Sequence, residues 1–213
     1  MMVNYIVQKR KMTSRLICFS LSLTCFLAAS SQDFDATNVA KVTILNPGLS
    51  YETRVGRFQT VYGQAFMNVS AYYSYSSSMG SSSEFYLDPA ATLQYRYYYN
   101  GMKRMEMEKR TEMNSMNYVA VISEVIFSKM RLTDDYFDES NRRGITRFGI
   151  AWGLQRNYKQ RFSLDLNLGL GYMIAKGTTY NYSGQLTTKT ITTPTMIGQF
   201  NIGFWLNREK DEE

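Results

Sequence analysis

The stretch that decides the fold is Arg161-Phe162-Ser163-Leu164-Asp165-Leu166-Asn167-Leu168-Gly169-Leu170-Gly171-Tyr172. Large apolar residues occupy every second position, and polar residues or glycines occupy the positions between them. Successive side chains of a β-strand point to opposite faces, whereas a helix would scatter both sets around its axis. The stretch therefore predicts one long strand. A soluble calyx and a membrane barrel both show this alternation, and they differ in which face meets water.

The N-terminus indicates a protein that is exported. Basic residues precede an apolar stretch, residues 16–29, and the small residues Ser30 and Ser31 follow it. This order is typical of a secretory signal peptide, and the apolar stretch of about 14 residues is shorter than the ~20 that a transmembrane helix needs. We expect residues 1–31 to be the signal peptide, with an uncleaved anchor as the alternative. The basic residues are Lys9, Arg10, Lys11 and Arg15.

Removal of this signal changes what the composition implies. Both cysteines, Cys18 and Cys25, lie within it, so the mature chain has no thiol for a disulfide or a metal site. The signal also takes four of the 24 basic residues and no acidic residue, which leaves 20 basic residues against 18 acidic ones. The mature net charge is then +2 with no basic stripe, so nucleic acid is not an expected partner.

The mature chain alternates strand-like segments with turns and loops. After a short polar lead at residues 32–37, period-two alternation predicts eight strands between residues 38 and 206, and a charged tail follows at residues 207–213. The charged connector at residues 100–115 is interpreted as a solvated turn with room for a helical piece. The predicted strands are residues 38–45, 49–55, 60–73, 85–99, 116–127, 145–156, 161–172 and 194–206.

Compact links and longer loops alternate between these strands. Turns at one end and loops at the other are typical of a bacterial outer-membrane barrel. The link Asn46–Gly48 departs from this pattern because it is too short for a surface loop. Either the first hairpin is low on the loop side or the first strand is misplaced. The compact links are residues 56–59, 100–115 and 157–160, and the predicted loops are residues 74–84, 128–144 and 175–193.

Three features favour a membrane barrel over a soluble calyx. Every lysine after Lys41 falls outside the predicted strands, although a strand face in contact with water would normally carry lysines. The polar faces combine small residues with charges of both signs, which suits the narrow interior of an eight-stranded barrel. Aromatic residues gather near the strand ends, as they do in the interfacial girdles of membrane barrels. The aromatic residues near the turn side are Tyr95, Tyr97, Tyr98, Tyr99, Phe162, Phe204 and Trp205.

We therefore predict an all-β fold, a closed antiparallel up-and-down transmembrane β-barrel of eight strands at residues 38–206, in the bacterial outer membrane. An unpaired backbone amide in hydrocarbon costs several kcal/mol, so strands cross a membrane only as a closed ring. The predicted polar network of the lumen comprises Glu52, Arg54, Asp88, Arg96, Glu124, Arg147 and Asp165. The predicted lipid-facing residues are Leu164, Leu166, Leu168, Leu170, Phe200, Ile202 and Phe204.

The residue types argue against catalysis. The chain has no histidine and its mature part has no cysteine, which excludes Ser-His and Cys-His nucleophile pairs and the commonest zinc ligands. Asp88, Glu124 and Asp165 are candidates for an acid–base pair, but carboxylates opposite arginines are more often structural. The four carboxylates within residues 134–139 lack the spacing of a calcium loop. We expect no catalytic site, no cofactor and no metal.

The chain resembles the small OmpA/OmpX-type outer-membrane β-barrels over residues 38–206. The resemblance implies two partners, outer-membrane lipid and the barrel assembly machinery. Such barrels often end on an aromatic residue, whereas here the charged residues 207–213 follow, so we expect recognition of the last strand to be internal. The segments that carry the resemblance are Phe200-Asn201-Ile202-Gly203-Phe204-Trp205-Leu206, Asn46-Pro47-Gly48-Leu49-Ser50-Tyr51-Glu52, Leu93-Gln94-Tyr95-Arg96-Tyr97-Tyr98-Tyr99 and Trp152-Gly153-Leu154-Gln155-Arg156.

These observations together predict a non-enzymatic barrel with a lumen filled by side chains. Its expected role is structural or one of surface interaction, with an extracellular partner bound through the loops at residues 74–84, 128–144 and 175–193. The alternative class is transport, either as a narrow porin-like channel or as a barrel that binds a small ligand or a lipid.

Overall fold

The computed structural model of the chain describes residues 35–76, 80–129, 142–180 and 183–207. These residues belong to the second of two compact units, Phe34–Glu213. The expected signal peptide at residues 1–31 and the charged tail beyond Asn207 lie outside the described residues. Within the described part of the chain, no helix is both long enough and apolar enough to cross a membrane.

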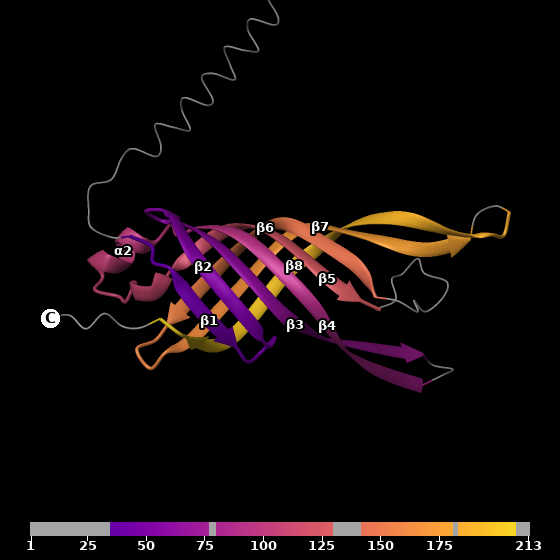
Figure 1. Cartoon of the computed structure of the whole chain (residues 1–213), viewed down its shortest axis with the longest axis horizontal. Helices are drawn as coiled ribbons and strands as arrows, with labels where there is room; N and C mark the ends of the chain where they lie inside the picture. The colour runs from indigo at the N-terminus through magenta and orange to yellow at the C-terminus, as the bar shows by residue number, and fades with distance from the viewer. Residues whose placement is uncertain (1–34, 77–79, 130–141, 181–182, 208–213) are drawn as a thin grey trace, which may run out of the picture. The chain divides into compact units, whose positions relative to one another are not determined.

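Eight antiparallel strands form one sheet that closes on itself (Figure 1). Each strand pairs with the next along the chain, and β1 also pairs with β8 to complete the ring. The predicted all-β class, the eight strands and their antiparallel up-and-down order are confirmed. The strands are β1 (Val39–Thr43), β2 (Gly48–Gly56), β3 (Gln59–Ser76), β4 (Gly80–Tyr97), β5 (Asn117–Ser128), β6 (Arg143–Asn157), β7 (Phe162–Tyr180) and β8 (Leu186–Trp205).

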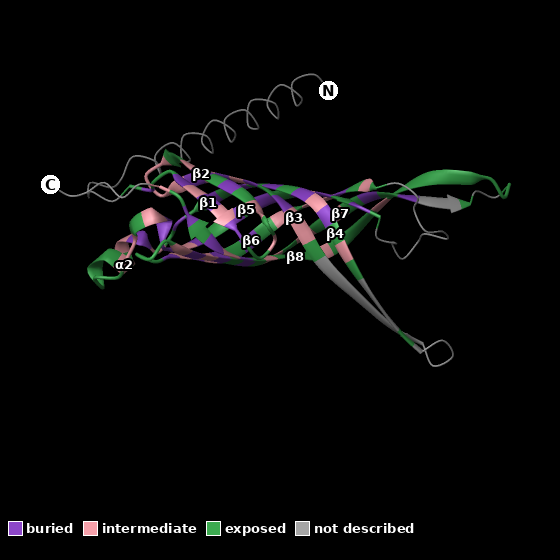
Figure 2. Ribbon diagram, turned by 60° about the horizontal axis from the view of Figure 1, so that its bottom comes forward, coloured by how far each residue is buried: buried purple, intermediate pink, exposed green. Residues whose placement is uncertain are grey.

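Alternation along each strand separates the inner face of the ring from its outer face. In β5, Tyr118, Ala120 and Ile122 are buried, whereas Val119 and Val121 between them are exposed. Figure 2 shows the same alternation of buried and exposed residues over the barrel wall. The core is therefore the interior of the ring, and large apolar side chains cover its outside.

The connector between β4 and β5 folds against the turn-side end of the ring. It contains α2 (Gly101–Glu106) and the 3-10 helix η1 (Glu112–Asn114), so the helical piece allowed for in this segment is present. Met113 and Asn114 have left-handed backbone angles, with φ of 51° and 61°. Just after them, Met116 is fully buried in a core cluster with Tyr98 and Tyr118. This packing closes the turn-side end of the barrel.

Two of the three predicted loops are instead strands. β3 and β4 stay paired as far as Ser76 and Gly80, and β7 and β8 as far as Tyr180 and Leu186. Threonine is a good strand former, so its abundance in residues 175–193 favours a hairpin over a loop. The prediction that later lysines lie outside strands is therefore wrong for two of them, Lys176 and Lys189. The third predicted loop, residues 128–144, lies mostly outside the described residues.

The first hairpin is the shortest in the ring. β1 has 5 residues and is shorter than the predicted strand at residues 38–45. Asn46 adopts a φ of 54° in the turn, a left-handed angle that asparagine tolerates better than most residues. β2 begins at Gly48, opposite Phe66, although β3 continues for ten residues beyond that point. Of the two alternatives for this region, the structure shows the first: the hairpin ends well short of the loop-side ends of the other strands.

Candidate functional site

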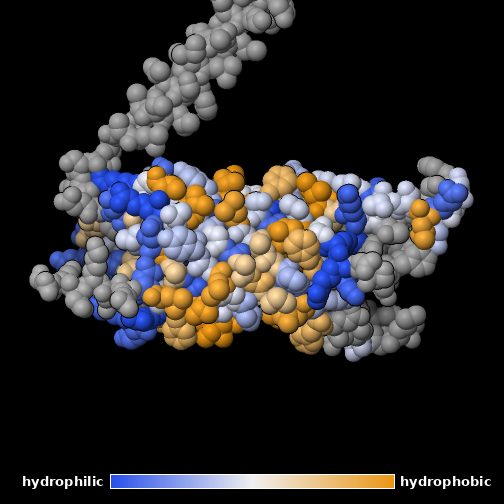
Figure 3. Space-filling model, in the orientation of Figure 1, coloured by the Kyte–Doolittle hydropathy of each residue, from blue (hydrophilic) through white to orange (hydrophobic). Residues whose placement is uncertain are grey.

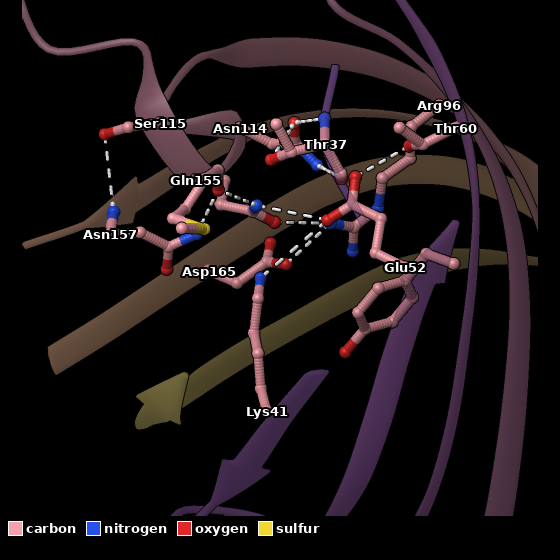
Figure 4. Close-up of polar contacts among 12 residues, drawn as sticks. Thr37, Lys41, Glu52, Thr60, Arg96, Asn114, Ser115, Gln155, Asn157 and Asp165 are labelled. Atoms are coloured by element: carbon pink, nitrogen blue, oxygen red, sulfur yellow. Dashed lines mark hydrogen bonds and ion pairs between the residues drawn. The ribbon is translucent and has the colours of Figure 1, made fainter. Parts of the chain in front are cut away.

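A buried polar cluster fills the turn-side half of the barrel interior (Figure 4). Its centre is Arg96 on β4, whose side chain is 0% exposed. The Nη1 atom of Arg96 donates hydrogen bonds of 2.8 Å to Asp165 Oδ2 on β7 and to Gln155 Oε1 on β6. The guanidinium carbon also lies 3.8 Å from the ring centre of Tyr62 and 4.3 Å from that of Tyr118, within the range of cation–π interactions.

Glu52 is the second acid of this cluster. Its Oε1 atom accepts hydrogen bonds from the hydroxyls of Thr60, at 2.6 Å, and Tyr98, at 2.5 Å. Its Oε2 atom lies 3.9 Å from Lys41 Nζ and 4.0 Å from the nearest nitrogen of Arg96. Two bases and two acids thus meet in the interior. A buried charge is tolerated when it is paired and hydrogen-bonded. Arg96 and both carboxylates meet this condition, whereas Lys41 Nζ pairs with Glu52 but has no hydrogen-bond partner among the described residues.

Small residues make room for the large side chains of the cluster. A Cβ atom on Gly153 would lie 2.3 Å from Cζ of Tyr118, so the tyrosine ring occupies the space that a side chain on β6 would need. The Tyr118 hydroxyl then donates a 2.7 Å hydrogen bond to Asp165 Oδ1, which completes the partners of this carboxylate together with Arg96.

The connector between β4 and β5 contributes to the same cluster from the turn side. Gln155 Nε2 donates to Glu52 Oε2 at 3.1 Å and to the Met113 carbonyl at 3.3 Å. Asn114 in turn exchanges two 2.8 Å hydrogen bonds with the backbone of Thr37, in the lead before β1. The hydrogen bonds therefore continue from the interior into the segments that cover this end of the ring.

An apolar layer separates this cluster from the loop-side half of the interior. Ile122 on β5 and Ile197 on β8 are both buried and belong to one core cluster. Gly149 and Gly171 leave the space for Ile197, since a Cβ atom on either glycine would lie 2.8 Å or 2.6 Å from its Cδ1 atom. Along β5, Ile122 thus lies on the inward face between Tyr118 of the cluster and Glu124 beyond it.

A separate ion pair lies beyond this layer. Arg147 on β6 donates from Nη2 to Glu124 Oε1 on the neighbouring strand β5. The Glu124 side chain is 4% exposed and that of Arg147 is 22% exposed. The Arg147 Nε atom has no hydrogen-bond partner among the described residues. The pair lines a cavity of about 290 Å³ together with Phe66, Asn68 and Gln199 among others.

The predicted lumen residues thus fall into separate groups. Glu52, Arg96 and Asp165 meet in the buried cluster, and Glu124 pairs with Arg147 beyond the apolar layer. Asp88 belongs to neither group: it accepts a hydrogen bond from Ser128 and lies 3.6 Å from Nε of Arg142.

Arg54 does not join either group. Its side chain is 45% exposed and pairs with Asp35 at 2.7 Å. The prediction that Arg54 belongs to the polar network of the lumen is therefore wrong. Its position has the inward phase, but the β2–β3 register shifts between Arg54 and Gly56, where β2 ends and leaves the packed interior.

Several residues of the buried cluster were missed by reasoning from the sequence. Tyr98 and Trp205 were assigned to the aromatic girdle, but both are almost fully buried. The phase of alternation was the available signal for Tyr98, because it is two positions from Arg96 and shares its inward face. The cluster residues that were not predicted are Lys41, Thr60, Tyr62, Tyr98, Tyr118 and Gln155.

The predicted lipid-facing residues all point away from this interior. Figure 3 shows apolar side chains over the middle of the barrel, with hydrophilic side chains toward both ends of the face in view. Five of the seven residues are exposed, and Leu164 and Ile202 are half-buried between their neighbours. The exposed residues are Leu166, Leu168, Leu170, Phe200 and Phe204.

The interior has the character of a packed core. The acids and bases of the buried cluster pair with one another, which suits a structural network. No group of three or more metal-ligating side chains occurs in the part of the chain that the structure describes. Glu124 and Arg147 line a cavity of the interior in which a small ligand has room.

Comparison with known proteins places the chain in a family. No curated protein and no solved structure matches it. A family model with the description "Protein of unknown function (DUF3575)" matches residues 17–206, which is most of the chain and includes every strand of the barrel. The chain therefore belongs to the DUF3575 family.

Proposed function

We propose that this protein is an outer-membrane β-barrel without catalytic activity that acts in surface interaction or in the structure of the cell envelope. The observation that carries the proposal is the contrast between the two faces of one closed ring. The inside holds the neutral cluster around Arg96, and the outside carries large apolar side chains. A membrane barrel of eight strands requires both features.

The outer face supports the location in a membrane. Soluble proteins rarely expose contiguous apolar patches larger than a few hundred Å². Here Leu168 and Leu170 on β7, Ile150 on β6 and Val121 on β5 are all more than half exposed. In hydrocarbon these side chains would be in their preferred environment, and the paired strands would leave few backbone groups unsatisfied.

The loop-side hairpins support a role in interaction. β3–β4 and β7–β8 extend beyond the ring and diverge from each other (Figure 1). The β7–β8 hairpin is polar and exposed, and it carries Lys176 and Lys189. An extracellular partner would bind the predicted segments 74–84, 128–144 and 175–193, of which the first and third are largely these hairpins.

Conductance across a planar bilayer tests this proposal against the alternative of a narrow channel. The buried cluster and the Ile122–Ile197 layer fill the ring, so we expect no steady single-channel steps, with a porin as the positive control in the same bilayers. A heat-dependent shift in gel mobility of the membrane fraction is expected as well, because a closed barrel resists detergent until it is boiled. Steady steps would favour the channel, and a freely water-soluble monomer would contradict a membrane barrel.

A further inference from the structure

The wall of the barrel is incomplete on the loop side of the first hairpin. The ladder between β8 and β1 covers Gly203–Trp205, with a further backbone hydrogen bond from Ile44 to Ile202, and the ladder between β3 and β2 ends at Phe66. Beyond these points both strands continue, and among the described residues the edges that face each other do not pair with one another. The turn of the first hairpin bonds only the near end of each edge, where the Met67 amide donates to the Pro47 carbonyl at 2.8 Å. We call this opening the β3–β8 seam, bounded by residues 67–71 of β3 and residues 194–199 of β8.

The ends of the seam are adapted to an open edge. Asn46, at the tip of the first hairpin, accepts a hydrogen bond from the Val69 amide at 3.4 Å and donates one to the Phe200 carbonyl at 3.3 Å. Alternate residues of a strand direct their backbone groups to the same side, so Pro194 is in phase with Phe200 and faces the seam. Proline has no amide to leave unpaired, and it is favoured on edge strands for that reason.

The seam leads to the cavity of about 290 Å³ beside the ion pair of Glu124 and Arg147. The cavity is lined by Leu45, Val69 and Phe200 at the outer face, and by Glu124 and Arg147 inside. On the turn side, the Ile122–Ile197 layer and the Arg96 cluster close the interior. The cavity is therefore bounded on the turn side, and the partly exposed Leu45, Val69 and Phe200 place its outer side at the apolar face.

We propose, on the basis of the membrane location proposed above, that the seam admits the head of one amphiphile from the surrounding bilayer, while its tail lies across the outer face. The lining residues carry this assignment. Leu45, Val69 and Phe200 are each 39–51% exposed, and they give the outer side of the pocket an apolar surface for a tail. Ligand pockets span about 300–1,000 Å³, so this cavity accommodates a head group but not a whole lipid.

The charges of the pocket select a zwitterionic head. Among the described residues that line it, the charged ones are Glu124 and Arg147, one acid and one base. A head that carries only an anion would meet the carboxylate as well as the guanidinium. A head with both an anion and a cation would place the anion on Arg147, whose Nε atom has no hydrogen-bond partner among the described residues, and the cation on Glu124.

The test is lipid retention by the whole protein. The protein is reconstituted in vesicles of equal parts phosphatidylethanolamine, which is zwitterionic, and phosphatidylglycerol, which is anionic. It is then extracted in dodecyl maltoside, and native mass spectrometry measures the mass of the protein together with any lipid that it retains. We expect one retained lipid per barrel, with the zwitterionic lipid enriched about tenfold over the anionic one.

Two matched variants separate the seam from the rest of the lipid-facing surface. Gly198→Phe places a ring at the pocket, where the nearest atom to a new Cβ is the flexible Leu168 Cδ1 at 3.3 Å, and it is expected to abolish retention. Gly63→Phe is the control. Gly63 lies on β3, which is paired there with both β2 and β4, and a new Cβ would have nothing within 4 Å, so this variant is expected to retain the lipid. The double variant Glu124→Gln/Arg147→Gln is expected to lose the zwitterionic preference.

The outcomes distinguish this inference from the proposed function. Equal retention by Gly198→Phe and Gly63→Phe, or equal amounts of the two lipids on the wild type, would overturn the pocket while the barrel remained intact by gel mobility. A dimer mass in place of the lipid would assign the seam to a second copy of the chain and also overturn it. If Gly198→Phe shows no heat-dependent gel shift, it has not folded as a barrel. The double variant Glu124→Gln/Arg147→Gln then decides, and an unchanged preference for the zwitterionic lipid would overturn the pocket. A wild-type protein that never inserts would contradict both proposals.

Discussion

The turn-side and loop-side halves of this barrel follow the same strand alternation but differ in how completely they are closed. In the turn-side half β1 joins β8, the ring is complete, and Arg96 is fully buried among its partners. In the loop-side half the first hairpin has ended, β3 and β8 face each other without pairing among the described residues, and the Arg147 side chain keeps 22% of its exposure.

The comparison separates two determinants of the interior. Alternation decides that Arg96 and Arg147 both point inward, whereas strand length decides whether the wall around each of them is closed. A buried arginine within a closed wall has a structural role because it is inaccessible. An inward arginine beside an opening can meet a molecule from outside. Removal of charges in the two halves should therefore have different effects on stability.

The largest loss of stability is expected from Arg96→Met in the closed half. The substitution leaves Asp165 and Glu52 in the interior without their arginine, and breaking a buried pair in this way costs about 3–5 kcal/mol. The free energy of unfolding in urea, with the protein in lipid vesicles, measures the loss through tryptophan fluorescence. The double variant Arg96→Met/Asp165→Leu should recover part of it, because no lone charge of the pair remains.

The matched single variant Asp165→Leu sharpens this prediction. It leaves Arg96 buried with the more distant Glu52 as its remaining acid, at 4.0 Å, so a loss of the same order is expected. If both single variants unfolded within ~1 kcal/mol of the wild type, the range seen for exposed ion pairs, the closed half would not depend on this pair.

The next largest effect is expected on the outer face of the ring, from Leu166→Arg. An arginine on the lipid side costs about 2–4 kcal/mol at the middle of a bilayer and little near or beyond its surface. Leu186→Arg, at an exposed position on the β7–β8 hairpin outside the ring, is the control and should be nearly neutral. Refolding yields in lipid vesicles compare the two. Equal yields would reverse the assignment of the faces.

The fold could be predicted where one face of a strand is buried. Residues 161–172 lie entirely in or next to β7 because their apolar positions repeat with the period of a strand. The same reasoning failed at residues 74–84 and 175–193, where the hairpins leave the ring and residues 186–190 of β8 are exposed on both faces. The serines of residues 74–84 indicate a loop, but pairing between the two arms of each hairpin keeps both segments extended.

The site could be predicted only in part, because alternation gives the face of a residue and not its neighbour across the ring. Glu52, Arg96 and Asp165 were assigned inward from phase alone. The partner of Asp165 could not be assigned, since Arg96 is 69 residues away and the two meet only once the ring has closed. The place of Lys41 in the cluster was not predicted for another reason. The alternation in its strand β1 is weak, and lysine is rarely buried.

Overpacking of the closed half is expected to have a smaller effect. Gly153→Ala would bring a methyl group within 2.3 Å of the Tyr118 ring and displace the hydroxyl that binds Asp165. Overpacking of this kind costs about 1–3 kcal/mol. Gly63→Ala, which meets nothing within 4 Å on β3, is the control and should change stability by less than ~1 kcal/mol. Unfolding midpoints of the two variants in urea, at equal slopes, measure the difference.

The smallest effect is expected from Glu124→Gln in the open half. Arg147 loses its acid, but its side chain is partly exposed beside the cavity, so water can replace part of the lost interaction. Exposed ion pairs contribute about 0–1 kcal/mol, and the loss should lie near the upper end of that range because Glu124 itself is buried. Glu52→Gln makes the same change in the closed half, where water has no access to Lys41 or Arg96, and it should cost more. Equal losses from the two variants in urea unfolding would mean that the seam does not admit water, and the difference between the two halves would then be one of geometry alone.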